Sequence, residues 1–374
     1  MHLDVALLQY THLTSLDIQR LRNINATFLL LTPGVNLIVG PNGSGKTSVC
    51  EAISLLFHGR SFRAASPFSI LIQNQAQALQ IQAKLCAKDQ QTIRIIMRRP
   101  LRGHWYLKVD DTKKDRLQDV TRLLPLKILA PEFENLVDTG SKERRQFLDW
   151  LLFHVEPTFA KEIAVYNNAL KQRNQCLSNK SVYDEELEFW SQQLVEAGTI
   201  IYQRRSSILK LLVNVLRPLL QGTPYGGIDV ALTESWLDAT DFKAKLFGVR
   251  REEFRRQRTL VGPHRTDVVL TQSITGKCVT LKAYYSRGQK KSIGLFFTIA
   301  AIQLLNELKG QKVLLVIDDW RAELDEASRT LLLSKINELR LQVVLTSTEL
   351  EDRLVLPAQS KVFQINQGQI NEYL

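Results

Sequence analysis

A glycine-rich segment near the N-terminus constrains this chain more than any other feature. Residues 40–47 read Gly-Pro-Asn-Gly-Ser-Gly-Lys-Thr and fit the pattern G-x-x-x-x-G-K-[ST]. An apolar run, Val35–Val39, precedes the segment and a helical pattern follows it, which is the strand–loop–helix context of a phosphate-binding loop. Glycines let backbone N–H groups turn toward a phosphate, and the helix N-terminus adds favourable partial charge. The segment predicts a nucleotide site; the alternative is an ordinary glycine-rich turn.

The residues of this loop have different predicted roles. Lys46 is long enough to reach the β- and γ-phosphates, and Thr47 can place its hydroxyl on Mg²⁺. ATP with Mg²⁺ is therefore the predicted ligand, and Lys46 is also a predicted catalytic residue. The predicted nucleotide-binding residues of the loop are Asn42, Gly43, Ser44, Gly45, Lys46, Thr47 and Ser48.

Composition indicates a soluble protein with an anionic partner. The 374 residues are enough for two or three domains, and 44% of them are hydrophobic. The net charge of +11 favours a polyanion, either nucleic acid or an anionic membrane. No clustered basic amphipathic helix is evident in the sequence, which favours nucleic acid over a membrane.

The sequence predicts a cytoplasmic location. No apolar stretch is long enough to span a bilayer, and the longest, residues 293–305, is predicted to be a core helix. The N-terminal residues lack the pattern of a signal peptide. The four cysteines are scattered without zinc-site or disulfide spacing, as expected of reduced thiols: Cys50, Cys86, Cys176 and Cys278.

Hydrophobic periodicity predicts an α/β fold in three segments. In the first, residues 1–135, strands are predicted at 16–21, 26–31, 35–39, 79–85, 92–97, 105–109 and 126–129. The second, residues 136–259, is rich in Leu, Glu, Gln, Lys and Arg and predicts helices at 141–155, 157–178 and 183–220, a strand at 228–232 and more helix to about 258. The third, residues 260–374, predicts helices at 286–308 and 326–340 and strands at 312–317, 342–346, 361–365 and 369–373. These patterns predict a nucleotide-binding region that is interrupted by a helical second lobe.

Two adjacent acids follow an apolar strand in the third segment. Val313–Ile317 is followed by Asp318 and Asp319. In phosphate-loop ATPases such a strand is expected beside the phosphate-loop strand, where Asp318 would hold Mg²⁺ and Asp319 would polarise the attacking water. Both are predicted catalytic residues. The alternative is a strand followed by a simple turn.

Three further segments carry polar groups suited to the same site. Ser286-Arg-Gly-Gln289 opens a long apolar helix, and its serine hydroxyl and exposed N–H groups suit an anion; Ser286, Gly288 and Gln289 are predicted nucleotide contacts. A plain capped helix is the alternative. Ala322-Glu-Leu-Asp325 follows the aspartate pair, and residues 346–348 read Thr-Ser-Thr, which can offer a hydroxyl to a γ-phosphate.

The order of these segments resembles the ABC-type ATPase head of the SMC-like class. In that class the S-x-G-Q serine of one subunit contacts the γ-phosphate held by the other, so the resemblance implies a dimer around two ATP molecules. A transporter-type head carries Glu after the aspartate and His at the final strand end. This chain has Asp319 and the threonine cluster at 346–348 in those places.

Further stretches resemble the RecF family of bacterial recombination proteins over nearly the whole chain. They are Arg22-Asn23, Gly59-Arg-Ser-Phe-Arg63, Glu143-Arg-Arg-Gln-Phe-Leu-Asp149, His154-Val-Glu-Pro157, Leu260-Val-Gly-Pro-His-Arg265, Ser286-Arg-Gly-Gln289 and the Asp-Asp…Glu-Leu-Asp325 segment. The resemblance implies an ATP-dependent homodimer that binds gapped DNA at single-strand/double-strand junctions. It also implies slow, DNA-stimulated ATP hydrolysis and cooperation with RecR and RecO in loading recombinase during DNA repair, recombination and replication and the SOS response. The alternatives are a nucleotide-binding module with negligible hydrolysis and a transporter-type ATPase.

The chain departs from the family pattern at a few positions. Ala322 stands where the family usually has Ser, and Trp320 and Arg321 are unusual neighbours of the aspartate pair. The glutamine that transporter-type heads carry at the helical lobe is not evident, since Pro131-Glu132 stand there. These departures bear on the turnover rate rather than on ATP binding.

Clusters of basic residues are candidate DNA contacts, because phosphate binding needs only accessible positive charge. Salt bridges with neighbouring acids are the alternative for each cluster. Arg63 has two predicted roles, as a sensor of the partner subunit or DNA and as a salt-bridge residue; Arg265 and His264 are either structural or contacts for nucleotide or DNA. The clusters are Arg98-Arg99, Lys142/Arg144/Arg145, Arg204-Arg205 and Arg250/Arg251/Arg255/Arg256/Arg258.

Overall fold

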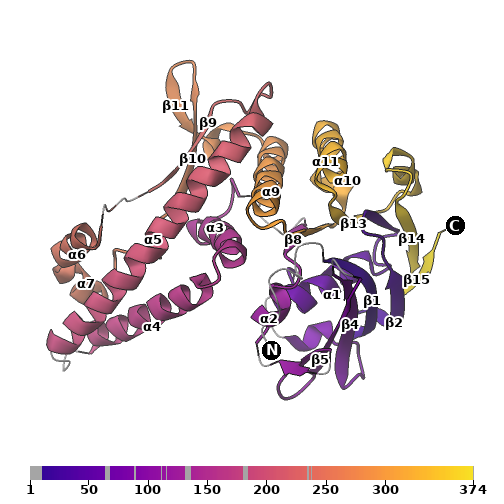
Figure 1. The fold of residues 1–374 in the computed structure, drawn as a ribbon, viewed down its shortest axis with the longest axis horizontal. Coiled ribbons are helices and arrows are strands. Elements are labelled where there is room, and N and C mark those ends of the chain that lie inside the picture. The colour runs from indigo at the N-terminus through magenta and orange to yellow at the C-terminus, as the bar shows by residue number, and fades with distance from the viewer. Residues whose placement is uncertain are drawn as a thin grey trace. The chain divides into compact units, whose positions relative to one another are not determined.

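The chain forms two compact units, Met1–Glu134 with Leu305–Leu374, and Asn135–Leu304 (Figure 1). The computed structural model describes residues 11–63, 68–87, 90–110, 112–114, 116–130, 136–179, 184–233, 236 and 238–373. The departure noted at Pro131-Glu132 lies outside these residues.

A six-stranded sheet in the first unit carries the phosphate loop. Its strand order is β15-β14-β3-β13-β12-β8, and every neighbouring pair is parallel except β14 with β15. All five residues of β3 are buried, as expected of a central strand covered on both faces. The strands are β3 (Val35–Val39), β8 (Leu126–Leu129), β12 (Leu314–Ile317), β13 (Gln342–Ser347), β14 (Lys361–Asn366) and β15 (Gln369–Glu372).

The position of β12 corrects one sequence-based prediction. The strand that ends in Asp318 does not lie beside β3, because β13 lies between them and pairs in parallel with both. An apolar run shows that a strand is buried, but it does not specify which neighbour it bonds to. The carboxyl ends of β3, β13 and β12 nevertheless meet at one edge of the sheet, since parallel strands point the same way.

A second, antiparallel sheet of the first unit packs against helix α1 (Lys46–His58). Its order is β2-β1-β4-β5-β6-β7. Strand β1 alternates between buried and less buried residues, as expected of a sheet with one face on a core. The strands are β1 (His12–Leu21), β2 (Ile24–Leu30), β4 (Ala78–Cys86), β5 (Thr92–Pro100), β6 (Tyr106–Val109) and β7 (Thr112–Lys114).

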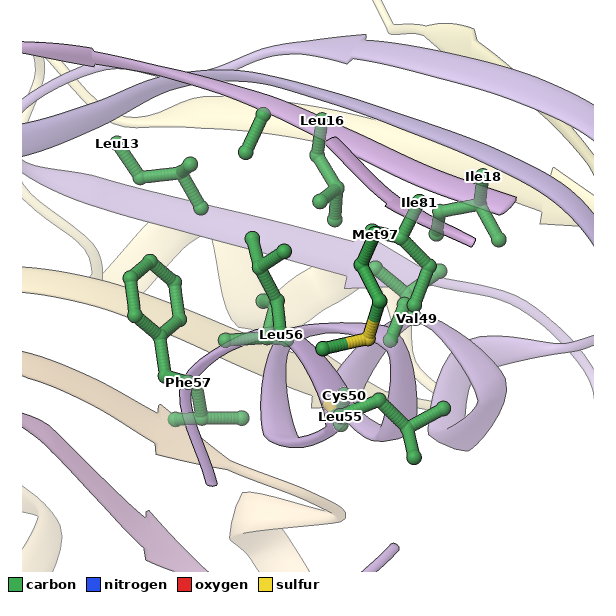
Figure 2. Close-up of a cluster of buried hydrophobic side chains, with 14 of the residues drawn as sticks. Leu13, Leu16, Ile18, Val49, Cys50, Leu55, Leu56, Phe57, Ile81 and Met97 are labelled. Carbon is green, nitrogen blue, oxygen red and sulfur yellow. The ribbon is translucent and has the colours of Figure 1, made fainter. Parts of the chain in front are cut away.

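Helix α1 (Lys46–His58) forms the centre of the first unit. Its side chains belong to one buried cluster with residues of both sheets, for example Ile81 of β4 and Val344 of β13. Figure 2 shows Val49 and Leu56 of α1 below the strands that carry Leu16, Ile81 and Met97. Most of the buried residues of α1 are apolar, and the polar Glu51 and Ser54 are buried with hydrogen-bond partners. This packing fixes the N-terminus of α1 beside the end of β3.

Further helical elements complete the first unit. They are η2 (Phe68–Leu71), α2 (Gln118–Thr121), α10 (Trp320–Glu323), α11 (Glu326–Leu339) and η3 (Leu350–Val355). The side chains of Trp320 and Arg321 both bond to the buried carboxylate of Asp352 on η3, with Trp320 Nε1 2.8 Å from Asp352 Oδ2. These two residues therefore join α10 to η3.

The second unit combines long helices with a three-stranded sheet of order β11-β10-β9. The helices predicted at 141–155, 157–178 and 183–220 are present within two residues of these bounds. The elements are α3 (Ser141–Val155), α4 (Phe159–Ser178), α5 (Asp184–Leu220), β9 (Ile228–Leu232), α6 (Ala239–Gly248), α7 (Arg250–Arg256), β10 (Val268–Ile274), β11 (Lys277–Thr280), α8 (Leu281–Tyr284) and most of α9 (Arg287–Lys309).

The compact units divide the chain after residues 134 and 304, whereas the predicted third segment begins at residue 260. Residues 260–304 group with the helical unit because β10 pairs with β9, and Tyr285 donates its hydroxyl to Gln272 within the same unit. Assignment of these residues to the ATPase head remains a prediction.

Helix α9 is, among the residues that the structure describes, the single helix long and apolar enough to cross a membrane by length and composition. This differs from the prediction that no such stretch exists. However, 72% of its most apolar window is buried inside the structure. Such burial is typical of a core helix, as predicted for residues 293–305.

A buried polar network holds α4, α5 and α7 together. Arg173 of α4 donates to Ser191 (2.9 Å), Thr259 (2.8 Å) and the carboxylate of Glu253 (2.6 Å). Both charged residues are almost fully buried, so the ion pair between them compensates each buried charge. His264 extends the network: its Nδ1 lies 2.6 Å from the Tyr166 hydroxyl, and its Nε2 lies 3.3 Å from the Thr259 carbonyl.

The structure predicts that stability falls in mild acid. Burial lowers the pKa of His264 to about 4 and that of His58 to about 4, from an ordinary value of 6.5. The unfolded chain therefore binds protons between pH 6.5 and 4 that the folded chain does not, and the free energy of unfolding should fall over that range, on the order of 3 kcal/mol for each histidine.

Urea unfolding at several pH values measures this loss. Replacing His264 with Gln should make the slope of unfolding free energy against pH shallower between pH 6.5 and 4. A histidine NMR titration of the folded protein that placed the pKa of His264 near 6.5 would contradict this prediction.

Candidate nucleotide site

The loop between β3 and α1 has the backbone conformation that its glycines predict. Gly43 and Gly45 have φ values of 76° and 118°, a region that residues with a Cβ rarely adopt. Gly40 makes a close approach, because a Cβ there would lie 2.3 Å from the carbonyl oxygen of Ile365. These glycines therefore allow a turn that other residues would strain.

The N-terminus of α1 is open to an anion. No side chain caps it, and its first turn carries no acidic residue. Its N–H groups therefore lack the usual internal partners, and the helix dipole favours negative charge there. The hydroxyl of Ser44 is buried without a hydrogen-bond partner. An anion in the loop would satisfy both groups, so the residues present fit a nucleotide phosphate.

Lys46 is held over the loop by two carbonyl groups. Its Nζ donates to the carbonyl oxygens of Gly40 (2.6 Å) and Pro41 (3.0 Å). Burial lowers the pKa of Lys46, while the nearby carboxylates of Asp318 and Asp319 act in the opposite direction. The predicted lysine and both predicted acids therefore lie in one electrostatic environment.

The two predicted Mg²⁺ ligands are within hydrogen-bond reach of each other. Burial raises the pKa of Asp318, and hydrogen bonds from Thr346 and Thr47 together with the charge of Arg63 oppose that rise. Among the described residues no group of three His, Cys, Asp or Glu side chains is placed to hold a metal. The pair fits Mg²⁺, an ion that commonly takes one or two protein ligands together with phosphate oxygens, and its binding by Thr47 and Asp318 remains a prediction.

Thr346 links the two aspartates. Its hydroxyl donates to Asp318 Oδ1 (2.7 Å) and accepts from the backbone N–H of Asp319 (2.7 Å). The single proton of this buried hydroxyl is already donated to Asp318, so it is not available for a γ-phosphate. Thr348 remains the exposed hydroxyl of this cluster. Asp319 itself has a left-handed backbone (φ 55°), which the bond to Thr346 helps to hold.

Asn23 and Arg22, which only the family resemblance singled out in the sequence, bond to the phosphate loop and to helix α1. Asn23 donates to the carbonyl of Gly43 (3.0 Å) and accepts from the hydroxyl of Ser48 (3.1 Å). Arg22 makes two bonds, 2.6 and 2.8 Å long, to the buried Glu51 on α1. No local motif predicted these contacts, because the partners are 20 to 29 positions apart.

Arg63 is positioned by the same group of residues. Its backbone N–H donates to the hydroxyl of Ser61 (3.0 Å), which in turn donates to Glu51 (2.5 Å). The side chain is exposed, and its charge acts on Asp318. Arg63 therefore lies near Asp318, and its two predicted roles, as a sensor of the partner subunit or DNA and as a salt-bridge residue, remain predictions.

The S-x-G-Q segment forms a reciprocal cap at the start of α9. Gln289 Oε1 accepts from the backbone N–H of Ser286 (3.0 Å), and Ser286 Oγ accepts from the backbone N–H of Gln289 (3.4 Å). Ser286, Gly288 and Gln289 are exposed and belong to the second unit, whereas Lys46 belongs to the first. Their contact with a nucleotide therefore remains a prediction.

Two other predicted residues have identifiable local roles. Asp325 is the N-cap of α11 and accepts from the backbone N–H of Ser328 (2.8 Å). Arg265 is exposed in the Gly-Pro-His-Arg turn of the second unit, next to His264, whose ring bonds place it in the buried network.

Several candidate DNA contacts are used inside the second unit. Arg144 makes two bonds to Asp267, and Arg205 makes two bonds to Asp149. Arg204 pairs with Glu156 (2.8 Å) and Glu162 (3.2 Å). These three arginines form salt bridges, which was the alternative to DNA contact. The arginines at residues 250–258 are largely exposed.

Comparison with known proteins agrees with this geometry. A family model described as RecF/RecN/SMC N terminal domain matches residues 12–371. The DNA replication and repair protein RecF of Shewanella baltica (strain OS155 / ATCC BAA-1091) is 34% identical over 364 residues, 96% of this chain and 98% of the relative. The chain belongs to the RecF family. The RecF protein of Vibrio cholerae serotype O1 (strain ATCC 39315 / El Tor Inaba N16961) is 33% identical over 370 residues, 96% of this chain and 99% of the relative.

Solved structures place this RecF-family chain in the ABC-type ATPase head fold. A structure described as the recombination mediator protein RecF-ATP in the RecFOR pathway has a TM-score of 0.86 and 25% identity, and each chain is covered completely. The Smc head domain of Pyrococcus furiosus, with an extended coiled coil, has a TM-score of 0.61 and 15% identity over 97% of this chain and 96% of that one, which shows the fold alone.

Replacing Thr346 tests whether its hydroxyl stabilises the folded protein by bonding to the two aspartates. Thr346→Val removes the hydroxyl that bonds Asp318 and the Asp319 N–H, and leaves both without that partner. Stability should fall by about 1–3 kcal/mol, because buried polar groups lose their hydrogen bonds. Thr346→Ser keeps the hydroxyl and should lose less. Equal losses for Val and Ser in urea unfolding would contradict the role given to this hydroxyl.

Proposed function

We propose that this protein is a cytoplasmic ATP-operated DNA-binding protein of replication and recombinational repair. One observation carries the proposal: Lys46, Thr47, Asp318 and Asp319 gather at one sheet edge around an open helix N-terminus. Relatives described as DNA replication and repair proteins, and a solved relative described with ATP in the RecFOR pathway, support it.

The residues of the site have distinct roles in this proposal. The loop N–H groups and Lys46 bind and orient the triphosphate, while Thr47 and Asp318 hold Mg²⁺. When bound, Mg²⁺ would neutralise charge on the phosphate oxygens. Asp319, whose backbone is fixed by Thr346, orients the attacking water. Turnover is slow and stimulated by DNA, so ATP acts as a switch.

A second copy of the chain completes the site in this proposal. Ser286 at the exposed start of α9 contacts the γ-phosphate held by Lys46 of the other copy, as the S-x-G-Q resemblance implies. ATP thus closes a homodimer, and hydrolysis opens it. Partner proteins related to RecR and RecO meet the closed form at gapped DNA and help load recombinase.

Two variants test the shared site. Lys46→Ala alone and Ser286→Arg alone should each abolish ATP-dependent dimers in sedimentation, because each removes one half of both sites. Mixing the two variants allows a dimer with one intact site, formed by Lys46 of one chain and Ser286 of the other. Partial recovery of dimers in the mixture is expected. No recovery, or ATP-dependent dimers of either variant alone, would refute a shared site.

Asp319→Asn tests hydrolysis against simple nucleotide binding. The amide cannot accept a proton, so turnover should fall about 10²-fold or more while ATP affinity stays close to that of the unaltered protein. A fluorescent ATP analogue measures affinity, and phosphate release measures turnover. If the unaltered protein shows no turnover with gapped DNA, the chain is a nucleotide-binding module without hydrolysis.

A further inference from the structure

Exposed phenylalanines gather at one end of the second unit. Four phenylalanines are exposed among the described residues, and three of them lie on α5, α6 and α7: Phe189 (54%), Phe247 (70%) and Phe254 (45%). Figure 1 shows α6 and α7 beside one end of α5. Single exposed apolar residues need no explanation, but three rings in one region indicate a contact surface.

Ion pairs bring the three helices together at this end. Glu188, next to Phe189 on α5, bonds Lys243 of α6 (3.0 Å) and lies 3.8 Å from Arg250 at the start of α7. These contacts place the ring-bearing segments next to one another. We call residues 188–189 and 239–258 the arm end.

The pattern of buried residues explains why these rings face solvent. On α6, Phe242 and Leu246 are buried, and Phe247 is the next residue after Leu246. On α7, Glu253 is buried against Arg173, and Phe254 is the next residue after it. One step along a helix turns a side chain by about 100°, so each ring turns out of the packed face. Neither ring is required for the core.

The arm end is basic. Residues 239–258 contain seven Lys and Arg but three Asp and Glu, and Glu253 is used by the buried Arg173. Arg255 and Arg256 share the single carboxylate of Glu252. Arg251 and Arg258 are exposed and have no side-chain partner within the described part of the chain.

This combination fits nucleic acid better than a protein partner. Phe and Arg are both common at protein interfaces, but Lys is depleted there. Residues 239–258 carry two lysines and an excess of positive charge, seven Lys and Arg against three Asp and Glu, which complements a polyanion. In duplex DNA the bases are stacked inside, so the duplex offers phosphates and no open ring face. Unpaired bases offer both, and aromatic side chains among basic residues bind them by stacking.

We propose that the arm end binds single-stranded DNA, with Phe247 and Phe254 stacking on unpaired bases and Arg251 and Arg258 on phosphates. This inference rests on the proposed DNA-binding function and assigns the single-stranded part of a gap to this surface. Stacking depends little on salt, whereas phosphate contacts release counterions and depend on it strongly. The two contributions can therefore be measured separately.

The test uses the full chain with Mg-ATP and two fluorescent DNAs, a gapped duplex and an intact duplex of equal length. The double variant Phe247→Ala/Phe254→Ala should bind gapped DNA about tenfold or more weakly, with an unchanged slope of log affinity against log salt. Its binding to intact duplex should be unchanged. Arg251→Ala should instead reduce the salt slope by about one on gapped DNA.

Controls keep the outcomes distinct. Ile200→Ala, at a 42% exposed apolar position of α5, is a matched control and should bind both DNAs normally. In the unaltered protein, 5-bromouracil placed in the gap should photo-crosslink to residues 239–258. Absence of this crosslink overturns the inference. So does a double variant that binds gapped DNA normally, or one that loses affinity for gapped and intact DNA equally. Failure of the unaltered protein to bind either DNA refutes the proposed function itself.

Discussion

The pairing of β13 with β3 on one side and β12 on the other is the constraint on which the site depends. It brings three strand ends to one edge and places Thr346 between the loop and the aspartates. Thr346 can then bond Asp318 and Asp319 at the same time. Buried acids are costly unless they are hydrogen-bonded, so this hydroxyl and Thr47 help to keep Asp318 at a fixed position.

Local patterns predicted the elements that carry the candidate site well, because phosphate-binding loops and buried strands have short sequence signatures. The loop glycines, the helix after Lys46 and the apolar strand before Asp318 each fall where periodicity and turn chemistry placed them. A capped helix start at Ser286 was the alternative given for the S-x-G-Q segment, and the structure adds the return bond from Gln289. The nucleotide contacts themselves remain predictions, apart from the grouping of the loop with both acids.

Relations between distant segments were harder to predict from one sequence. The insertion of β13 between β3 and β12 depends on strand register, and the bonds of Asn23 and Arg22 join positions far apart in the chain. Basic clusters were visible in the sequence, but only side-chain geometry separates the internally paired Arg144 and Arg205 from the exposed arginines of α7. The exposed rings of the arm end were missed for a similar reason, because an isolated phenylalanine in a helix usually faces the core.

The cap at the start of α9 has a consequence for the serine proton. In this cap Ser286 Oγ uses a lone pair to accept from Gln289, so its O–H remains able to donate to an outside acceptor. The accepted bond restricts the rotamers of the side chain before any acceptor arrives. Part of the conformational entropy of the Ser286 side chain is therefore lost when the protein folds, and less is lost when the hydroxyl binds an acceptor.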